Sequence, residues 1–201
     1  MEVVVLTHRR IFWLALAASI IPFSTQAQTT AEMIEQAVLP LPDDLKAGAT
    51  VFKYDADSGQ RIVLRQGSNQ VECQPMNEDG FTRCGPTAEG PRRDMQASLS
   101  AEGLSSDDVQ SALQKAEDMG HIKARAFGAL NYRLYNKDDR IQLLWVVSVP
   151  NASASQLGYP TGSQRDNSLA GRGTPWMMRE GTSGAHLMIP INGTALSNNP
   201  H

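Results

Sequence analysis

Hydrophobic and polar residues follow two different periods along the chain, one typical of strands and the other of helices. In the segment 60–66, Ile62 and Leu64 point to one side, and this period of two predicts a β-strand. Four short stretches rich in Val, Ile, Phe and Tyr are expected to be strands: 49–55, 60–66, 69–74 and 80–84. Turn-forming sequences separate them, so we expect the four strands to form a meander.

Apolar residues recur at helical spacing in the middle of the chain. Ser105 and the acids after it begin this helix, and Gly120 ends it. One face of the helix carries apolar residues expected in the core: Val109, Ala112, Leu113, Ala116 and Met119. Shorter helices are expected over 31–39, 43–48 and 92–103.

The C-terminal half returns to the period of strands. Strands are expected over 127–136 and 140–150, and a final hairpin from 175–179 to 185–191. Both faces of 140–150 are apolar, which predicts a central strand covered on both sides. Residues 150–174 show no period, and so long a loop is either mobile or functional. The order of helix, strands, helices and strands predicts a single α+β domain with a mainly antiparallel sheet.

The N-terminus has the layout of a secretory signal peptide. Arg9 and Arg10 form a basic segment, residues 11–23 are apolar, and small and polar residues follow up to Ala27. The apolar segment is shorter than the roughly 20 residues of a membrane span, so an uncleaved anchor is the competing interpretation. We expect cleavage near Ala27 and export to the periplasm or the medium. The pair Arg9-Arg10 followed by Phe12 also fits a twin-arginine signal, which leaves the export route open.

Cleavage after Ala27 leaves a chain of one-domain length. Its expected parts are a short helix and extended entry over 28–48, an α+β domain over 49–196 and a frayed tail over 197–201. The chain has 18 basic and 21 acidic residues, and loss of Arg9, Arg10 and Glu2 leaves 16 and 20. With that balance and no block of basic residues, nucleic acid is not an expected partner. Without another apolar run of membrane length, no span is expected in the mature chain.

Cys73 and Cys84 are the only cysteines. An even pair close in sequence in an exported protein predicts a disulfide. The turn signal Asp79-Gly80 between them predicts a hairpin that brings the two sulfurs together. A metal site is the competing interpretation, but two cysteines without a nearby histidine provide only half of a zinc site.

No metal and no cofactor are expected. Asp55 and Asp57 match the start of a calcium-binding loop, which then fails, because Gln60 and Gln66 replace its glycine and its final acid. A hairpin turn explains this segment better than a calcium site.

His186 is the residue most open to a chemical role. In the strand 185–191 it lies on the side opposite to Leu187, directly after a glycine-rich loop whose backbone donors could bind an anion. Ser183 precedes it by three residues, but the sequence shows no third member of a triad and no nucleophile elbow. A structural histidine bonded to a neighbouring strand or loop is the competing interpretation. Trp176 and Tyr159 are further candidates for a ligand-binding wall, with core packing as the alternative.

Several segments together resemble a family of uncharacterised exported bacterial proteins: AVLPLPDDLKAGATV at 37–51, the Tyr54-Asp55 turn, the cysteine pair, GTPWMM at 173–178 and GAHLMI at 184–189. They span most of the mature chain, and residues 86–126 match least. The resemblance implies a location in the bacterial envelope or outside the cell. It brings no established activity, so it assigns no catalytic residue.

Three functions are open on this evidence. The first is a non-enzymatic domain that binds a small ligand or an envelope partner through 150–174 and the face of His186. The second is a secreted hydrolase-like enzyme that uses His186 with Ser183 or with an acid supplied by the fold. The third is a structural component of the envelope. We expect the first, because the sequence contains no complete catalytic set. Ligand, partner and oligomeric state stay open.

Overall fold

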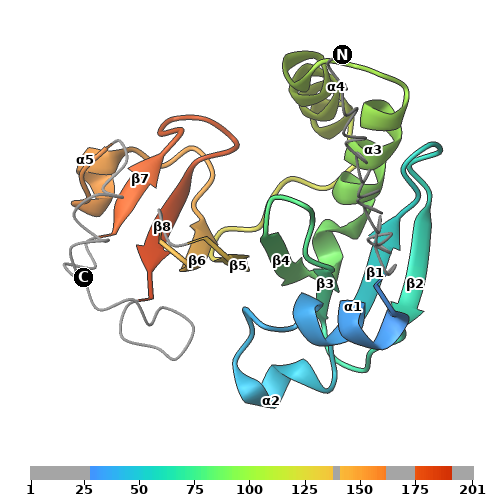
Figure 1. Ribbon diagram of the computed structural model, residues 1–201. Helices are drawn as coiled ribbons and strands as arrows, with labels where there is room; N and C mark the ends of the chain where they lie inside the picture. The colour runs from blue at the N-terminus through green and yellow to red at the C-terminus, as the bar shows by residue number, and fades with distance from the viewer. Residues whose placement is uncertain (1–27, 138–140, 162–174, 192–201) are drawn as a thin grey trace, which may run out of the picture.

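A computed structural model of the protein describes residues 28–137, 141–161 and 175–191. Eight strands form one sheet (Figure 1): β1 (Thr50–Tyr54), β2 (Arg61–Arg65), β3 (Val71–Gln74), β4 (Phe81–Pro86), β5 (Leu130–Tyr135), β6 (Leu143–Ser148), β7 (Trp176–Met178) and β8 (His186–Pro190). Their order across the sheet is β2-β1-β3-β4-β5-β6-β8-β7, and β1 and β3 are the one parallel pair of neighbours among these strands. The sheet is therefore mixed, and the predicted α+β class is confirmed.

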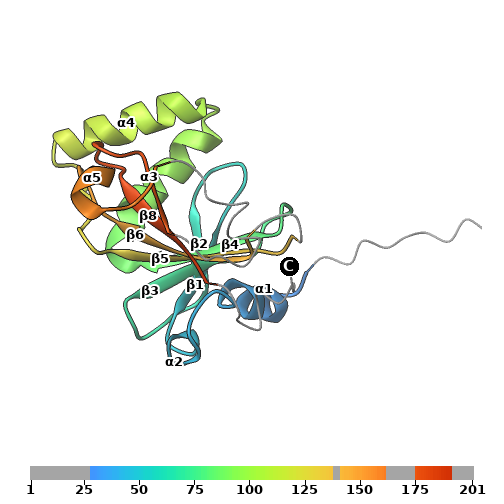
Figure 2. The ribbon, with the colours of Figure 1, turned by 90° about the vertical axis from the view of Figure 1, so that its left-hand side faces the viewer.

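Helices cover both faces of this sheet. They are α1 (Thr30–Ala37), α2 (Asp43–Lys46), the 3-10 turn η1 (Thr87–Glu89), α3 (Gly90–Ala101), α4 (Ser106–Asp118) and α5 (Ala154–Leu157). Seen edge-on, the sheet has α3 and α4 on one side and α1 and α2 on the other (Figure 2). The helices predicted over 31–39, 43–48 and 92–103 are confirmed with shifted ends, whereas α5 lies in a segment expected to be a loop.

Helix α4 forms as the sequence predicts. The side chain of Ser105 accepts a hydrogen bond from the backbone N–H of Asp108, which satisfies one of the free donors at the helix start. Three residues of the predicted stripe are buried against α3: Val109, Leu113 and Ala116. Met119, expected in the same stripe, is instead 57% exposed, because it is the C-cap, where the chain leaves the helix.

The predicted meander of β1 to β4 is wrong in its strand order. β2 lies at the sheet edge, and β3 pairs with the other side of β1. The chain reverses at Gly67, whose N–H donates to the hydroxyl of Thr50. A Cβ on Gly67 would lie 2.3 Å from the carbonyl oxygen of Gly48, so only glycine lets the chain cross so close to the start of β1.

The strands of the C-terminal half form as predicted. β5 and β6 pair antiparallel, β6 lies inside the sheet between β5 and β8, and β7 and β8 form the final hairpin. Within the described ranges, no helix is both long and apolar enough to cross a membrane. The predicted signal peptide at 1–27, the tail at 197–201 and residues 162–174 of the predicted loop lie outside the described residues.

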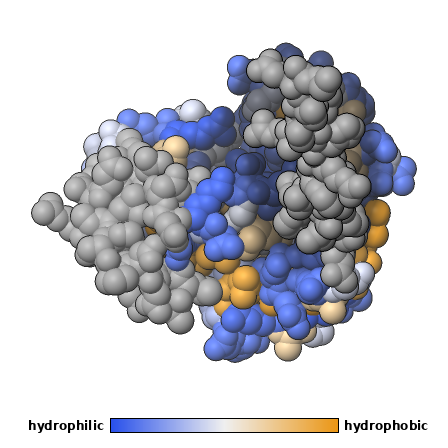
Figure 3. Space-filling view, in the orientation of Figure 1, coloured by the Kyte–Doolittle hydropathy of each residue, from blue (hydrophilic) through white to orange (hydrophobic). Residues whose placement is uncertain are grey.

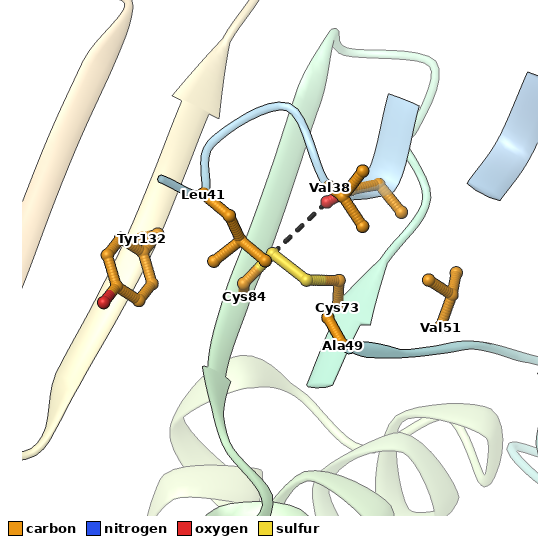
Figure 4. Close-up of a cluster of buried hydrophobic side chains, with 8 residues drawn as sticks. Val38, Leu41, Ala49, Val51, Cys73, Cys84 and Tyr132 are labelled. Atoms are coloured by element: carbon orange, nitrogen blue, oxygen red, sulfur yellow. Dashed lines mark hydrogen bonds between the residues drawn. A yellow bond between two sulfur atoms is a disulfide. The ribbon is translucent and has the colours of Figure 1, made fainter. Parts of the chain in front are cut away.

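The predicted disulfide is confirmed. Cys73 on β3 and Cys84 on β4 are directly opposite in register, and their sulfur atoms are 2.07 Å apart. Both are fully buried on the α1 face of the sheet (Figure 4). The apolar side chains around them are Val38, Leu41, Ala49, Val51 and Tyr132.

Replacing both cysteines by alanine is expected to lower the free energy of unfolding by about 2 to 4 kcal/mol, because the bond restricts the unfolded chain and fills the core. Urea denaturation with and without a reductant measures this loss. Reductant should destabilise the wild-type protein and leave the double variant unchanged. A wild-type curve that does not move on full reduction would contradict the assigned role of the bond.

Candidate functional site

Polar side chains gather on the face of the sheet that α3 covers. Arg83 on β4 and Arg133 on β5 are directly opposite in register, as are Ser148 on β6 and His186 on β8. Register also places these four side chains and Asn131 on one face, since alternate residues of a strand point to the same side. They form the floor of a cleft with a volume of about 120 Å³, hereafter the arginine cleft.

The walls of the arginine cleft come from segments far apart in the sequence. Helix α3 and η1 contribute one group of wall residues, and the segment before β5 and the turn between β7 and β8 contribute another. The wall residues are Glu89, Arg92, Arg93 and Gln96 from η1 and α3, Arg125 from the segment before β5, and Arg179 and Gly184 from the β7–β8 turn. Hydrophilic residues occupy the surface between the α3–α4 pair and the β7–β8 hairpin (Figure 3).

Only two of the six arginines in the cleft have carboxylate partners. Arg92 pairs with Glu117, and Arg93 pairs with Glu72 and Glu89. The other four form no ion pair with a carboxylate in the part of the chain that the structure describes: Arg83, Arg125, Arg133 and Arg179. The six arginines thus have only three glutamates as ion-pair partners, which leaves the cleft strongly positive.

This concentration of like charge is unfavourable in itself. Burial lowers the pKa of the Arg83 guanidinium to about 10, and repulsion from Arg93 and Arg133 adds to the effect. Burial also lowers the pKa of Arg125, with repulsion from Arg92 as the next cause. The lowered pKa values mean that the charged forms of both guanidinium groups are destabilised in this cleft. An anion bound in the cleft would stabilise these charged forms.

Buried contacts hold Arg93 in place at the cleft wall. Its Nε donates to Glu72 Oε1 over 2.9 Å, and Arg61 donates to the same carboxylate from the other side. The guanidinium of Arg61 in turn lies 3.7 Å from the ring centre of Phe52. This anchoring keeps Arg93 at the cleft wall without a ligand, which is the preorganisation that binding sites require.

Gly85 makes room for the cleft floor. A Cβ at this position would lie 2.3 Å from Oδ1 of Asn131 and 3.1 Å from Nη1 of Arg93. Only glycine lets both side chains approach the backbone of β4 so closely.

Two buried polar atoms in the cleft wall have no hydrogen-bond partner in the described part of the chain. They are Oε1 of Glu89 and Nε of Arg92. Buried polar atoms are nearly always paired in native proteins, so each of these two atoms requires a partner, which is either a water molecule or a ligand in the cleft. One is an acceptor and the other a donor, which bears on the kind of ligand that fits.

His186 makes a hydrogen bond to the preceding loop and also lines the arginine cleft. Its Nδ1 lies 2.8 Å from the carbonyl oxygen of Gly184, so this nitrogen carries a proton and bonds to the preceding loop. The ring also lines the arginine cleft. Burial lowers the pKa of His186, and the hydrogen bond to Gly184 opposes this, while Arg133, Arg125 and Arg179 add to the decrease. The ring is therefore neutral at neutral pH, and its Nε2 is the unprotonated nitrogen.

We expect this histidine to make the empty protein less stable in acid. The folded pKa lies below the ordinary value of 6.5, so the unfolded chain binds more protons once the pH falls below that value. The stability contributed by the neutral histidine is fully present above the ordinary histidine pKa, and it is lost as the pH falls below that pKa. Thermal unfolding of wild type and His186→Gln, followed from about pH 7.5 to about pH 5, isolates the effect. The wild type should lose more stability, and parallel curves would contradict the inferred neutral state.

Ser183 lies beside the arginine cleft and not next to His186. Its hydroxyl donates to the side chain of Gln114 on α4, and no hydrogen bond joins it to His186 in the described residues. It lines a second pocket of about 150 Å³ with Gln110, Gln114 and Thr182. The pocket and the cleft share four wall residues: Arg92, Arg125, Arg179 and Gly184. The two spaces are therefore adjacent.

The two aromatic candidates do not line the arginine cleft. Trp176 is buried in a core cluster with Val146 and Met188, in agreement with the alternative of core packing. Tyr159 is 37% exposed and lies outside the cleft. Of the four predicted ligand-binding residues, the structure brings His186 into the cleft and Ser183 to its edge.

The arginines of the cleft are the residues that the sequence analysis missed. They form no block of basic residues in the sequence, because the six come from β4, α3, β5, the segment before β5 and the β7–β8 turn. One signal was available. The chain has 13 arginines and only five lysines. In addition, Arg83 and Arg133 lie inside strands, where a charged side chain is unusual unless it has a partner or a function.

The donors in this cleft suit an anion and not a metal cation. In the described ranges, no group of three or more His, Cys, Asp or Glu residues could hold a metal ion. Guanidinium groups donate hydrogen bonds and never accept them, so they bind carboxylate, phosphate and similar oxyanions. No family model, no curated protein and no solved structure matches this chain.

Proposed function

We propose that this protein is an exported binding protein for a small anionic ligand, which it holds in the arginine cleft. One observation carries the proposal: four arginines without carboxylate partners among the described residues converge in a single cleft. Such a cluster costs stability and is therefore expected where function requires it. Planar guanidinium groups can each donate two parallel hydrogen bonds to an oxyanion.

The size of the cleft and the charge of the chain favour a small anion over a long one. The cleft measures about 120 Å³, which fits a phosphate-sized group and its immediate substituents. After loss of residues 1–27, the chain has 20 acidic and 16 basic residues, so the protein outside the cleft is acidic. That surface repels an extended polyanion such as nucleic acid.

Export is part of the proposal. The layout of residues 1–27 is that of a signal peptide cut near Ala27, and the buried Cys73–Cys84 disulfide suits an oxidising compartment. The resemblance to exported bacterial proteins agrees with both. The ligand would thus be met in the periplasm or outside the cell.

A second candidate function is hydrolysis of an anionic ester, and the state of His186 favours it. A neutral imidazole with an unprotonated Nε2 beside several arginines has the properties of a general base near a bound anion. Phosphate-ester hydrolysis by wild type and His186→Ala tests this candidate. Turnover that survives the substitution unchanged would rule out the histidine as the base.

Native mass spectrometry of the protein from its exporting host tests the binding proposal. We expect a chain that begins after Ala27, lacks two hydrogens because of the disulfide, and carries an anionic molecule. Arg133→Gln should lose that molecule, whereas Lys115→Gln, which removes a charge from the exposed face of α4, should keep it. Retention of the molecule by Arg133→Gln, or a wild-type chain that binds no added oxyanion, would contradict the proposal.

A further inference from the structure

We infer that Glu89 selects the anion, and that the cleft takes a phosphoryl group that carries a proton: orthophosphate or a phosphate monoester. The inference rests on the proposed anion binding and adds the class of ligand. In the complex, the P–OH group of the ligand donates a hydrogen bond to Oε1 of Glu89, while the arginines bind the other oxygens.

Glu89 has one occupied and one unoccupied oxygen. Its Oε2 accepts a hydrogen bond from Nη1 of Arg93 over 3.4 Å. Its Oε1 is buried and has no hydrogen-bond partner in the described part of the chain. An ionised carboxylate can only accept hydrogen bonds, so the missing partner must be a donor. A buried acceptor without a donor destabilises the protein, and a ligand that supplies one gains affinity.

Glu89 also lines the cleft together with the arginines. Its charge acts on Arg83 and on Arg125, which lie on different sides of the cleft. It is the only carboxylate among the described residues that line the cleft. Because Glu89 lines the same cleft as the arginines, an anion bound there lies near this negative charge. An oxyanion without a proton is repelled by it, whereas one with a hydroxyl group can donate to it.

This arrangement separates oxyanions of almost equal size. At neutral pH, orthophosphate keeps a hydroxyl group and sulfate has none, although both are tetrahedral. Phosphate monoesters lose their last proton with a pKa of about 6, so part of the population is a donor near that pH. Phosphodiesters have no such proton. We therefore expect phosphate to bind more tightly than sulfate, and a phosphate monoester to bind more tightly than a phosphodiester.

Glu89 could instead serve only to offset the charge of the arginines. In that case, its removal strengthens the binding of every anion by the same factor and leaves their ratio unchanged. The ratio of the phosphate and sulfate affinities therefore distinguishes a selective Glu89 from one that only offsets charge.

Calorimetric titration of the full mature chain in chloride buffer at neutral pH tests the inference. We expect the wild type to bind orthophosphate at least about tenfold more tightly than sulfate, the size expected for one buried hydrogen bond against an unpaired acceptor. In Glu89→Gln the ratio should fall to about one, mainly because sulfate binds more tightly. Glu117→Gln is the matched control: it removes an acid that pairs with Arg92 but does not itself line the cleft, and it should keep the ratio. Glu89→Asp, which keeps the charge but shortens the reach, should give an intermediate ratio and covers the case in which Glu89→Gln does not fold.

The outcomes separate this inference from the proposed function. Wild-type protein that binds neither anion overturns both. Equal binding of phosphate and sulfate, or an unchanged ratio of the two affinities in Glu89→Gln, overturns the inference. Neither result contradicts the proposal that the cleft binds anions. Glycerol 3-phosphate and vesicles with phosphatidic acid then identify the source of the phosphoryl group, with phosphatidylglycerol vesicles as the diester control. Binding to the diester at the same strength as to the monoesters would also overturn the inference.

Discussion

Replacing Arg133 by leucine should stabilise the empty protein and weaken anion binding at the same time. Arg133 lies at the centre of the cleft floor, opposite Arg83, and has no ion pair in the described residues. Burial is the main cause of the lowered pKa values of Arg83 and His186, and removal of Arg133 relieves the repulsion that adds to both decreases. It also removes a charged donor, which corresponds to a loss of about tenfold to a hundredfold in anion affinity.

Thermal unfolding with and without orthophosphate measures both effects. Without phosphate, the variant should melt above the wild type. With phosphate, the wild type should gain stability by mass action and the variant should gain little. Lys115→Gln should behave as wild type in both conditions, since its charge lies outside the cleft. A destabilised Arg133→Leu that still responds to phosphate would assign a structural role to Arg133.

Replacing Glu72 by alanine should have the largest effect on stability. Glu72 is 6% exposed and accepts hydrogen bonds from both Arg61 and Arg93. Its loss leaves two guanidinium groups close together with less counter-charge, and breaking a buried ion pair in this way costs about 3 to 5 kcal/mol. Arg93 also loses the contacts that hold it at the cleft wall, so anion affinity should fall as well.

Urea denaturation of Glu72→Ala tests this expectation. Glu35→Ala, on the exposed side of α1, is the control and should change the free energy of unfolding by less than about 0.5 kcal/mol. A loss below about 1 kcal/mol for Glu72→Ala would show that the two arginines find other partners or water. In that case, the preorganisation of Arg93 would need another explanation.

Local periodicity predicted most of the elements, because each is set by residues close in sequence. The turn at Gly80, the cap at Ser105 and the alternation of 185–191 are all local signals, and each led to an element that the structure contains. The strand order around β1 was not predictable in this way. It depends on the close crossing at Gly67, and nothing in the neighbouring residues indicates which side of β1 the returning strand occupies.

The candidate site was only partly predictable for the same reason. Alternation placed His186 on the correct side of its strand, because the apolar residues Leu187 and Ile189 define the other side. Each arginine of the cleft is, in its own segment, an isolated polar residue. They share one cleft only because the register of β4 and β5 and the position of α3 bring them together.

The most direct test of the arginine cleft is a crystal structure grown with arsenate, a tetrahedral analogue of phosphate whose arsenic atom can be located by anomalous scattering. We predict an arsenic peak inside the cleft, with oxygens within hydrogen-bond distance of the guanidinium groups of Arg83 and Arg133. The same data should show whether an arsenate hydroxyl approaches Oε1 of Glu89. Arsenate bound elsewhere on the protein, with only water in the cleft at saturating concentration, would contradict the assignment of this cleft as an anion site.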